Sequence, residues 1–172
     1  MSVLIDNSIT IYEALENIKN GKYVMPAFQR QYVWNMEQIE KLWDSILLDY
    51  PIATFLFWHV DDDNVSWDTY FCNFLSEVSF DSRKQAVSVN YELSNINVKI
   101  TDTAVLDGQQ RLTSLFLSLL GQAYVKQKYA RRTAVGGTVV KLVIELNKHK
   151  LTVDEEEYNS KKYDIKFTEK VG

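Results

Sequence analysis

Apolar residues recur at helical spacing near the start of the chain. Thr10 and Glu13 have the spacing of a capping box, in which a side chain and the backbone at a helix start exchange hydrogen bonds. The apolar positions behind them fall on one helical face: Ile11, Leu15 and Ile18. The pattern predicts a first helix over residues 10–20.

A second amphipathic stretch follows at residues 36–49. Asn35 and Gln38 repeat the capping spacing directly before it. Pro51 cannot donate a backbone hydrogen bond, so it prevents the helix from continuing. A second helix is therefore predicted over these residues.

Short β-rich runs separate the helical stretches. The run ATFLFWHV, residues 53–60, is apolar almost throughout, which predicts a strand covered on both faces. The same kind of evidence predicts further elements: strands over 22–25, 103–106, 122–131 and 138–146, and a third helix over 109–120.

The length of the chain bounds its organisation. The 172 residues, 46% of them hydrophobic, can bury a sizeable core and suit one domain. Residues 148–172 are charged and mixed, with one weak strand and no obvious core. We expect a folded domain over residues 1–147 and a C-terminal segment over 148–172 that leads to a downstream domain absent from this chain.

Composition excludes several classes of protein. The formal net charge of -4 argues against coating nucleic acid by bulk electrostatics, so any DNA contact must be local or indirect. Cys72 has no disulfide partner, and the two histidines, His59 and His149, give no zinc-ligand grouping. No apolar run reaches the roughly 18 to 20 residues that span a membrane. We expect a cytoplasmic protein with no membrane partner.

Two interpretations fit the stretch VLDGQQRLTSL, residues 105–115. In the first, Asp107 is the N-cap of the third helix and Gln110 its reciprocal partner, a cap that contributes about 0.5 to 2 kcal/mol. In the second, the free N–H groups at the helix start bind an anion or nucleotide, and Arg111 adds a forked donor. The residues alone leave both open.

A second polar pair lies in PAFQRQYVW, residues 26–34. Gln29 and Arg30 stand among aromatic residues that anchor such loops in many proteins, and Arg30 is then solvated or paired with a carboxylate. Alternatively, two Gln-Arg pairs, each leading into a helix, allow both helix starts to converge on one ligand.

These two blocks, with YPIATFLFW at residues 50–58 between them, resemble the N-terminal domain family of GmrSD-type modification-dependent restriction proteins, in the ParB N-terminal/sulfiredoxin-like superfamily. The resemblance covers roughly residues 8 to 120. It implies an α+β (mixed α/β) domain, with a small mixed sheet packed by helices, that binds and hydrolyses a nucleoside triphosphate. In that family the domain often controls a nuclease further along the chain.

The resemblance also implies roles for particular residues. The nucleotide-binding residues would be Gln29, Arg30, Gly108, Gln109 and Arg111. The catalytic residues would be Asp107, Gln110 and Arg111, with Asp107 holding Mg²⁺ or orienting water. ParB-like relatives carry a Gly-Glu-Arg-Arg-type sequence at this helix start, so base preference and hydrolysis do not transfer to the glutamines found here. Ala53 also departs from the glycine that relatives often carry.

The preferred hypothesis is a nucleotide-binding, hydrolysing regulatory domain of a modification-dependent restriction or phage-defence protein. No His-Asn-His signature is present, so the nuclease is expected outside this chain, and DNA is expected to bind through a downstream domain. The alternatives are a DNA-sensing or protein-interaction module without turnover and a phosphotransfer role. A homo-oligomer, with a second copy of the chain as partner, is also left open. The basic residues available to a DNA-sensing module are Lys126, Lys128, Arg131 and Arg132.

Overall fold

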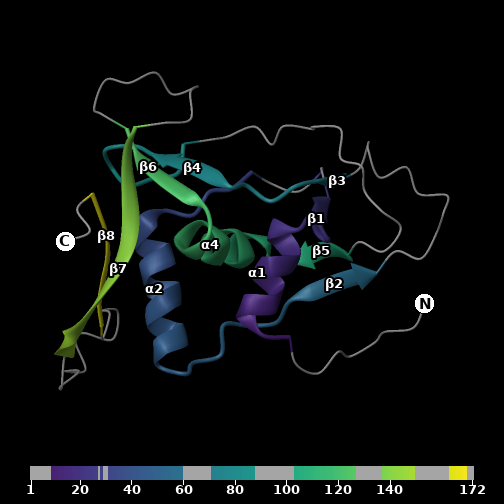
Figure 1. Ribbon diagram of the computed structural model, residues 1–172, viewed down its shortest axis with the longest axis horizontal. Coiled ribbons are helices and arrows are strands. Elements are labelled where there is room, and N and C mark those ends of the chain that lie inside the picture. Colours follow the sequence, from purple (N-terminus) through teal and green to yellow (C-terminus); the bar gives the residue numbers. More distant parts are fainter. Residues whose placement is uncertain are drawn as a thin grey trace.

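The computed structural model describes residues 9–26, 28, 31–59, 71–87, 103–126, 137–149 and 163–169. Within these residues the helices are α1 (Ile11–Lys19), α2 (Met36–Leu47) and α4 (Gln109–Leu119). The strands are β1 (Tyr23–Pro26), β2 (Leu56–His59), β3 (Phe71–Cys72), β4 (Glu77–Phe80), β5 (Thr103–Asp107), β6 (Gln122–Val125), β7 (Thr138–His149) and β8 (Tyr163–Thr168) (Figure 1). None of the described helices is long and apolar enough to cross a membrane.

The described strands form two mixed sheets. The first has the order β2-β5-β1-β3, with β1 and β5 parallel and the outer pairs antiparallel. The second has the order β4-β6-β7-β8, in which only β4 and β6 are parallel. The predicted α+β class is confirmed, although there are two small sheets rather than one. The ParB/sulfiredoxin-like topology stays a prediction.

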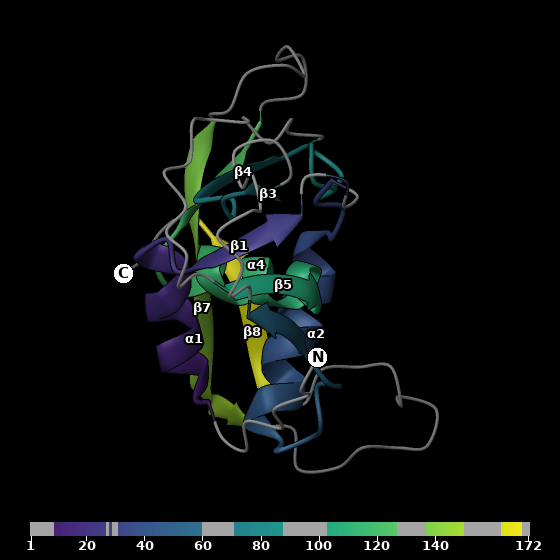
Figure 2. The same cartoon turned by 90° about the vertical axis from the view of Figure 1, so that its right-hand side faces the viewer.

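Helix α4 contributes to two of the hydrophobic clusters formed by the described residues. Leu112 and Leu115 pack in one cluster with Leu15 of α1, whereas Leu117 packs in the other with Phe80 of β4. Figure 1 shows α4 in the middle, with α2, β7 and β8 on one side and β1, β2 and β5 on the other. In the turned view of Figure 2, β1, β5 and β2 lie in front of α4. Both ends of α4 are therefore fixed by packing.

The two N-terminal helices match their predictions. Both predicted capping boxes are present: the Thr10 side chain accepts from the Glu13 N–H, and the Asn35 side chain accepts from the Gln38 N–H. In each box the N3 side chain also accepts from the N-cap backbone N–H. Local side-chain chemistry thus sets where these helices begin.

The prediction that residues 53–60 form a strand covered on both faces is wrong. The strand is only Leu56–His59, and it lies at the outer edge of its sheet, paired with β5 alone among the described strands. Leu56 is 55% exposed and Trp58 is 38% exposed. Phe57 packs against the core and the ring of Tyr23, and Trp58 contacts the buried ring of Phe71, so the strand is only partly covered.

The segment after residue 147 contributes to the core, contrary to expectation. Strand β8 pairs with β7, and its Ile165 is fully buried. The backbone N–H of Tyr163 donates to Asp44 Oδ1 at 2.9 Å, and that of Phe167 donates to Glu40 Oε1 at 3.1 Å. We call this contact the α2–β8 junction. The domain boundary after residue 147 stays a prediction.

Candidate functional site

The first turn of α4 begins at Gly108 and not at Asp107. Asp107 is the last residue of β5, and Gly108 is the N-cap with a left-handed φ of 88°. Among the described residues, no side chain caps this turn; instead Asp107 Oδ1 accepts from the Gly108 N–H at 2.7 Å. The capping interpretation of Asp107 and Gln110 is therefore wrong. It fails because the left-handed turn at Gly108 separates the carboxylate from the N–H groups it would have capped.

Glycine is required at position 108 for two reasons. A φ of 88° is unfavourable for any residue with a Cβ. A Cβ here would also stand 2.8 Å from Cε1 of Phe55 and closer still to Cδ1. The ring of Phe55 thus packs directly against the backbone at the start of α4.

Gln110 holds a distant piece of backbone against the same turn. Its Oε1 accepts from the Val33 N–H at 3.0 Å, and its Nε2 donates to the Gln31 carbonyl at 3.2 Å. One helical turn on, Ser114 Oγ lies 2.7 Å from the buried Tyr32 hydroxyl. The segment that follows the predicted Gln29 and Arg30 is therefore fixed at the start of α4. Gln29 and Arg30 themselves lie outside the described residues, so their roles stay predictions.

Arg111 holds a second segment. Its guanidinium donates to the carbonyl of Ile52 and, at 2.7 Å, to that of Thr54. The same group lies 4.6 Å from the centre of the Phe55 ring, and 3.8 Å separates its Nη2 from Asp107 Oδ2. Only 15% of the Arg111 side chain is exposed. The arginine is thus largely occupied by contacts within the protein.

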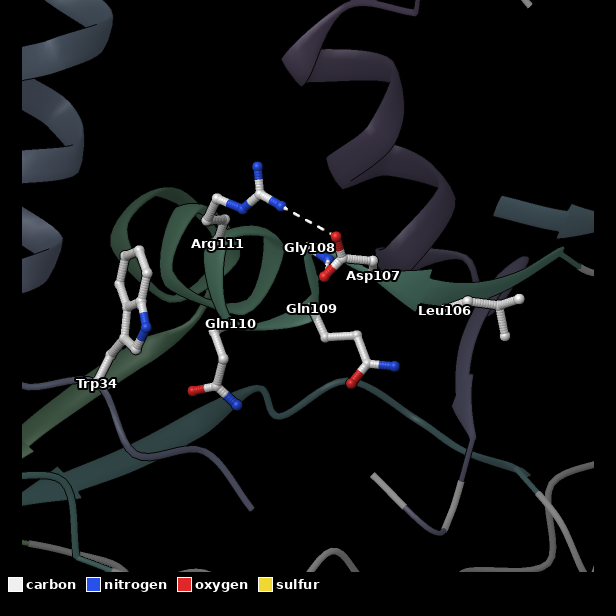
Figure 3. A pocket seen from close by; sticks show the side chains of 7 residues that line it. All are labelled: Trp34, Leu106, Asp107, Gly108, Gln109, Gln110 and Arg111. Atoms are coloured by element: carbon white, nitrogen blue, oxygen red, sulfur yellow. Dashed lines mark hydrogen bonds and ion pairs between the residues drawn. The ribbon is translucent and has the colours of Figure 1, made fainter. Parts of the chain in front are cut away.

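The five residues at positions 107–111 do not converge on one point. Figure 3 shows Asp107 and Arg111 on one side of the first turn, and Gln109 and Gln110 on the other. Gln109 is buried, and its Nε2 donates to the Val105 carbonyl. Of the predicted site side chains that the structure describes, Asp107 is the most open, with 70% of its side chain exposed.

A pocket of about 170 Å³ opens at this turn. It is lined by residues 107–111 together with Leu106 and Trp34. Small-molecule pockets usually measure about 300 to 1,000 Å³, so this space suits a group the size of one or two phosphates better than a whole nucleotide. Trp34 was not predicted as a site residue.

Comparison with known proteins decides the family. A family model described as the N-terminal domain of the GmrSD restriction endonuclease matches residues 11–171. This chain belongs to that family. This chain is 30% identical to an uncharacterized protein of Methanocaldococcus jannaschii over 109 residues. The matched residues cover 63% of this chain and 16% of the relative. The chain therefore spans about a sixth of the length of the curated relative it matches.

Residues 52–55 of the GmrSD-type domain touch the site but were missed as part of it. The one sequence signal for them was Ala53, at a position where the resemblance implies glycine. Ala53 adopts a left-handed φ of 66°, a conformation that glycine reaches without strain. The position marks a turn that brings residues 52–55 onto Arg111.

Other candidate residues are accounted for by packing. Lys126 is buried, and desolvation lowers the pKa of its ammonium group, so it is not a surface contact for DNA. The remaining basic candidates, Lys128, Arg131 and Arg132, lie outside the described residues. Cys72 is buried, which raises the pKa of its thiol to about 11. His59 Nδ1 lies 2.8 Å from Thr103 Oγ1.

No cluster of three or more metal-ligating side chains occurs among the described residues. A divalent cation at Asp107 would therefore take its remaining ligands from phosphate oxygens and water, as Mg²⁺ commonly does.

Proposed function

We propose that this GmrSD-type domain binds a nucleoside triphosphate with Mg²⁺ at the start of α4 and hydrolyses it. In this proposal it is the regulatory part of a restriction or phage-defence protein. The nuclease lies outside this chain, and DNA binds through a downstream domain. The observation that carries the proposal is the first turn of α4, which no described side chain caps and which opens into a pocket beside the exposed Asp107.

The backbone at this turn suits the phosphates. N–H groups at a helix start carry a partial positive charge and bind phosphate oxygens. Gly108 gives the turn its left-handed start, and the Arg111 guanidinium lies beside the turn, 3.8 Å from the Asp107 carboxylate. The pocket volume of about 170 Å³ fits part of a phosphate chain, with the rest of the nucleotide extending out of it.

Asp107 explains why the proposal includes Mg²⁺. Its exposed carboxylate would repel a triphosphate unless a cation lay between them. Asp107 would hold Mg²⁺, which would neutralise phosphate charge; charge neutralisation with positioning is most of what phosphoryl transfer requires. The amide of Gln110 already bridges residues 31 and 33, so water orientation falls to Asp107. Gln29 and Arg30 would approach from the segment that Gln110 holds.

A nucleotide titration tests this proposal. Thermal unfolding is measured with each nucleoside triphosphate, with and without Mg²⁺, and phosphate release is measured in parallel. A ligand at 100 times its Kd stabilises the folded state by about 2.7 kcal/mol, which is easily detected. We expect a nucleoside triphosphate to stabilise the protein only when Mg²⁺ is present. In Asp107→Asn, the affinity for that nucleotide should fall at least about tenfold.

The control is Glu37→Gln, which neutralises another exposed carboxylate, on α2. It should leave nucleotide affinity unchanged. A protein that responds to no nucleotide but binds duplex DNA with a steep salt dependence would instead support a DNA-sensing module without turnover.

A further inference from the structure

Residues 52–55 form a loop that is fastened to the start of α4 at two places. The Arg111 guanidinium binds the carbonyls of Ile52 and Thr54, and the Phe55 ring fills the space left by the missing Cβ of Gly108. The same ring lies under the guanidinium, 4.6 Å from its centre to Cζ. Arg111, Phe55 and Gly108 are thus one packed unit.

The loop requires this support. Between its two bound carbonyls lies Ala53, whose φ of 66° costs roughly 1 to 2 kcal/mol for a residue other than glycine. Strained backbone persists only where surrounding contacts hold it. The two guanidinium hydrogen bonds to residues on either side of Ala53 supply such contacts.

We propose that Phe55 and Arg111 are positioning residues of the nucleotide site. This inference rests on the proposed function and adds residues 52–55 to the site. Arg111 fixes the loop, the loop sets the Phe55 ring against Gly108, and the ring fixes the first-turn N–H groups and Asp107. Arg111 therefore acts on the ligand through the loop, and the phosphates are bound by the backbone of the turn.

Lysine at position 111 separates this role from direct phosphate binding. Lysine keeps the positive charge, but its compact ammonium group cannot bridge two carbonyls in a planar fork or stack flat on an aromatic ring. If Arg111 serves the ligand by charge, Arg111→Lys retains most of the affinity. If Arg111 holds the loop, Arg111→Lys resembles Arg111→Ala.

The experiment compares Arg111→Lys, Arg111→Ala, Phe55→Ala and the double variant Arg111→Lys/Phe55→Ala. The control is Arg83→Lys, in the turn that follows β4. Steady-state hydrolysis with Mg²⁺ gives KM and kcat. Hydrogen exchange of the ligand-free protein gives the protection of residues 52–57.

We expect each single variant to raise KM at least about tenfold and to change kcat less than about threefold. A partly unfolded variant would lower kcat with KM unchanged. The double variant should be little worse than either single variant, because both remove one coupled unit. Exchange should accelerate at residues 52–57 in all three single variants and stay unchanged in α2, which reports that the fold is intact.

Wild-type KM in Arg111→Lys, or unchanged exchange at residues 52–57 in the variants, would overturn the proposal. A wild-type protein that binds no nucleotide would overturn the proposed function instead. The exchange measurement needs no ligand, so it still decides whether Arg111 and Phe55 hold the loop.

Discussion

The start of α4 and the α2–β8 junction contain the same kind of contact, but the contact has a different role in each. In both, polar side chains of a helix hold backbone from a distant part of the chain. At the junction, Asp44 and Glu40 are buried and accept from N–H groups 119 and 127 residues away. At the start of α4, Gln110 and Arg111 hold segments 57 to 79 residues away, but Asp107 stays exposed and the first turn is uncapped.

The difference shows how to separate a binding site from a structural contact. A buried carboxylate that accepts from backbone N–H groups is used for stability, because leaving those groups unpaired costs about 1 to 3 kcal/mol each. An exposed carboxylate beside an uncapped helix start retains its capacity for a ligand. The hydrogen bonds of each polar side chain must therefore be known before a function is assigned to it.

The largest effect is expected from Gly108→Ala. The added Cβ would overlap the Phe55 ring, and the left-handed backbone would be strained. Together these effects should destabilise the protein by about 2 to 5 kcal/mol. Urea unfolding measures the loss, and labelling of the buried Cys72 thiol provides a second probe of the unfolded fraction.

Gly21→Ala is the matched control for that change. Gly21 also has a left-handed φ, of 70°, but a Cβ there would meet nothing within 4 Å. Gly21→Ala should therefore destabilise the protein only through the strained left-handed backbone, by about 1 to 2 kcal/mol. Equal costs at the two glycines would contradict the close packing of Phe55 against the start of α4.

An intermediate effect is expected at the junction. Asp44→Ala and Glu40→Ala each leave a backbone N–H of β8 without its carboxylate acceptor, so each should cost about 1 to 3 kcal/mol. Hydrogen exchange should accelerate in β8 and the part of β7 that pairs with it. Nucleotide affinity should be unchanged, and a change at the start of α4 would show that the two regions are coupled.

The smallest effect on stability is expected from Asp107→Asn. Asparagine keeps a side-chain oxygen that can accept from the Gly108 N–H. The ion pair with Arg111 is lost, but it is long, at 3.8 Å, and the Asp107 side chain is exposed. The cost should be below about 0.5 kcal/mol. Asp44→Asn makes the same chemical change at the junction and should cost more. Thermal unfolding without nucleotide measures the loss of stability in the two variants. A larger loss for Asp107→Asn than for Asp44→Asn would contradict the view that the junction is the structural contact.

The sequence predicted the elements whose signals are local. The capping boxes at Thr10 and Asn35 fixed two helix starts, and the apolar spacing after residue 108 predicted α4 closely. The burial of residues 53–60 was mispredicted because an apolar strand can lie at the edge of a sheet, where some of its side chains pack on neighbouring strands and others stay exposed. Apolar content alone does not reveal which neighbours a strand has.

Five of the predicted site residues lie together at one pocket, and their nucleotide-binding and catalytic roles stay predictions. Residues 107–111 do line a pocket, yet the sequence could not show that Gly108 and not Asp107 begins the helix. Nor could it show that the amide of Gln110 and the guanidinium of Arg111 would be bound to carbonyls of distant loops. These contacts depend on tertiary packing, which leaves no regular spacing in the sequence.

The contacts of the two regions also become possible at different moments of protein synthesis. The described partners of the Gln110 and Arg111 side chains precede them in the chain, whereas Asp44 and Glu40 must wait for Tyr163 and Phe167. At roughly 5 to 20 residues per second, the ribosome adds the intervening stretch of about 56 residues in roughly 3 to 11 seconds. During that interval α2 carries its carboxylates in water, and a chaperone that binds the nascent chain would meet the uncovered flank of α2.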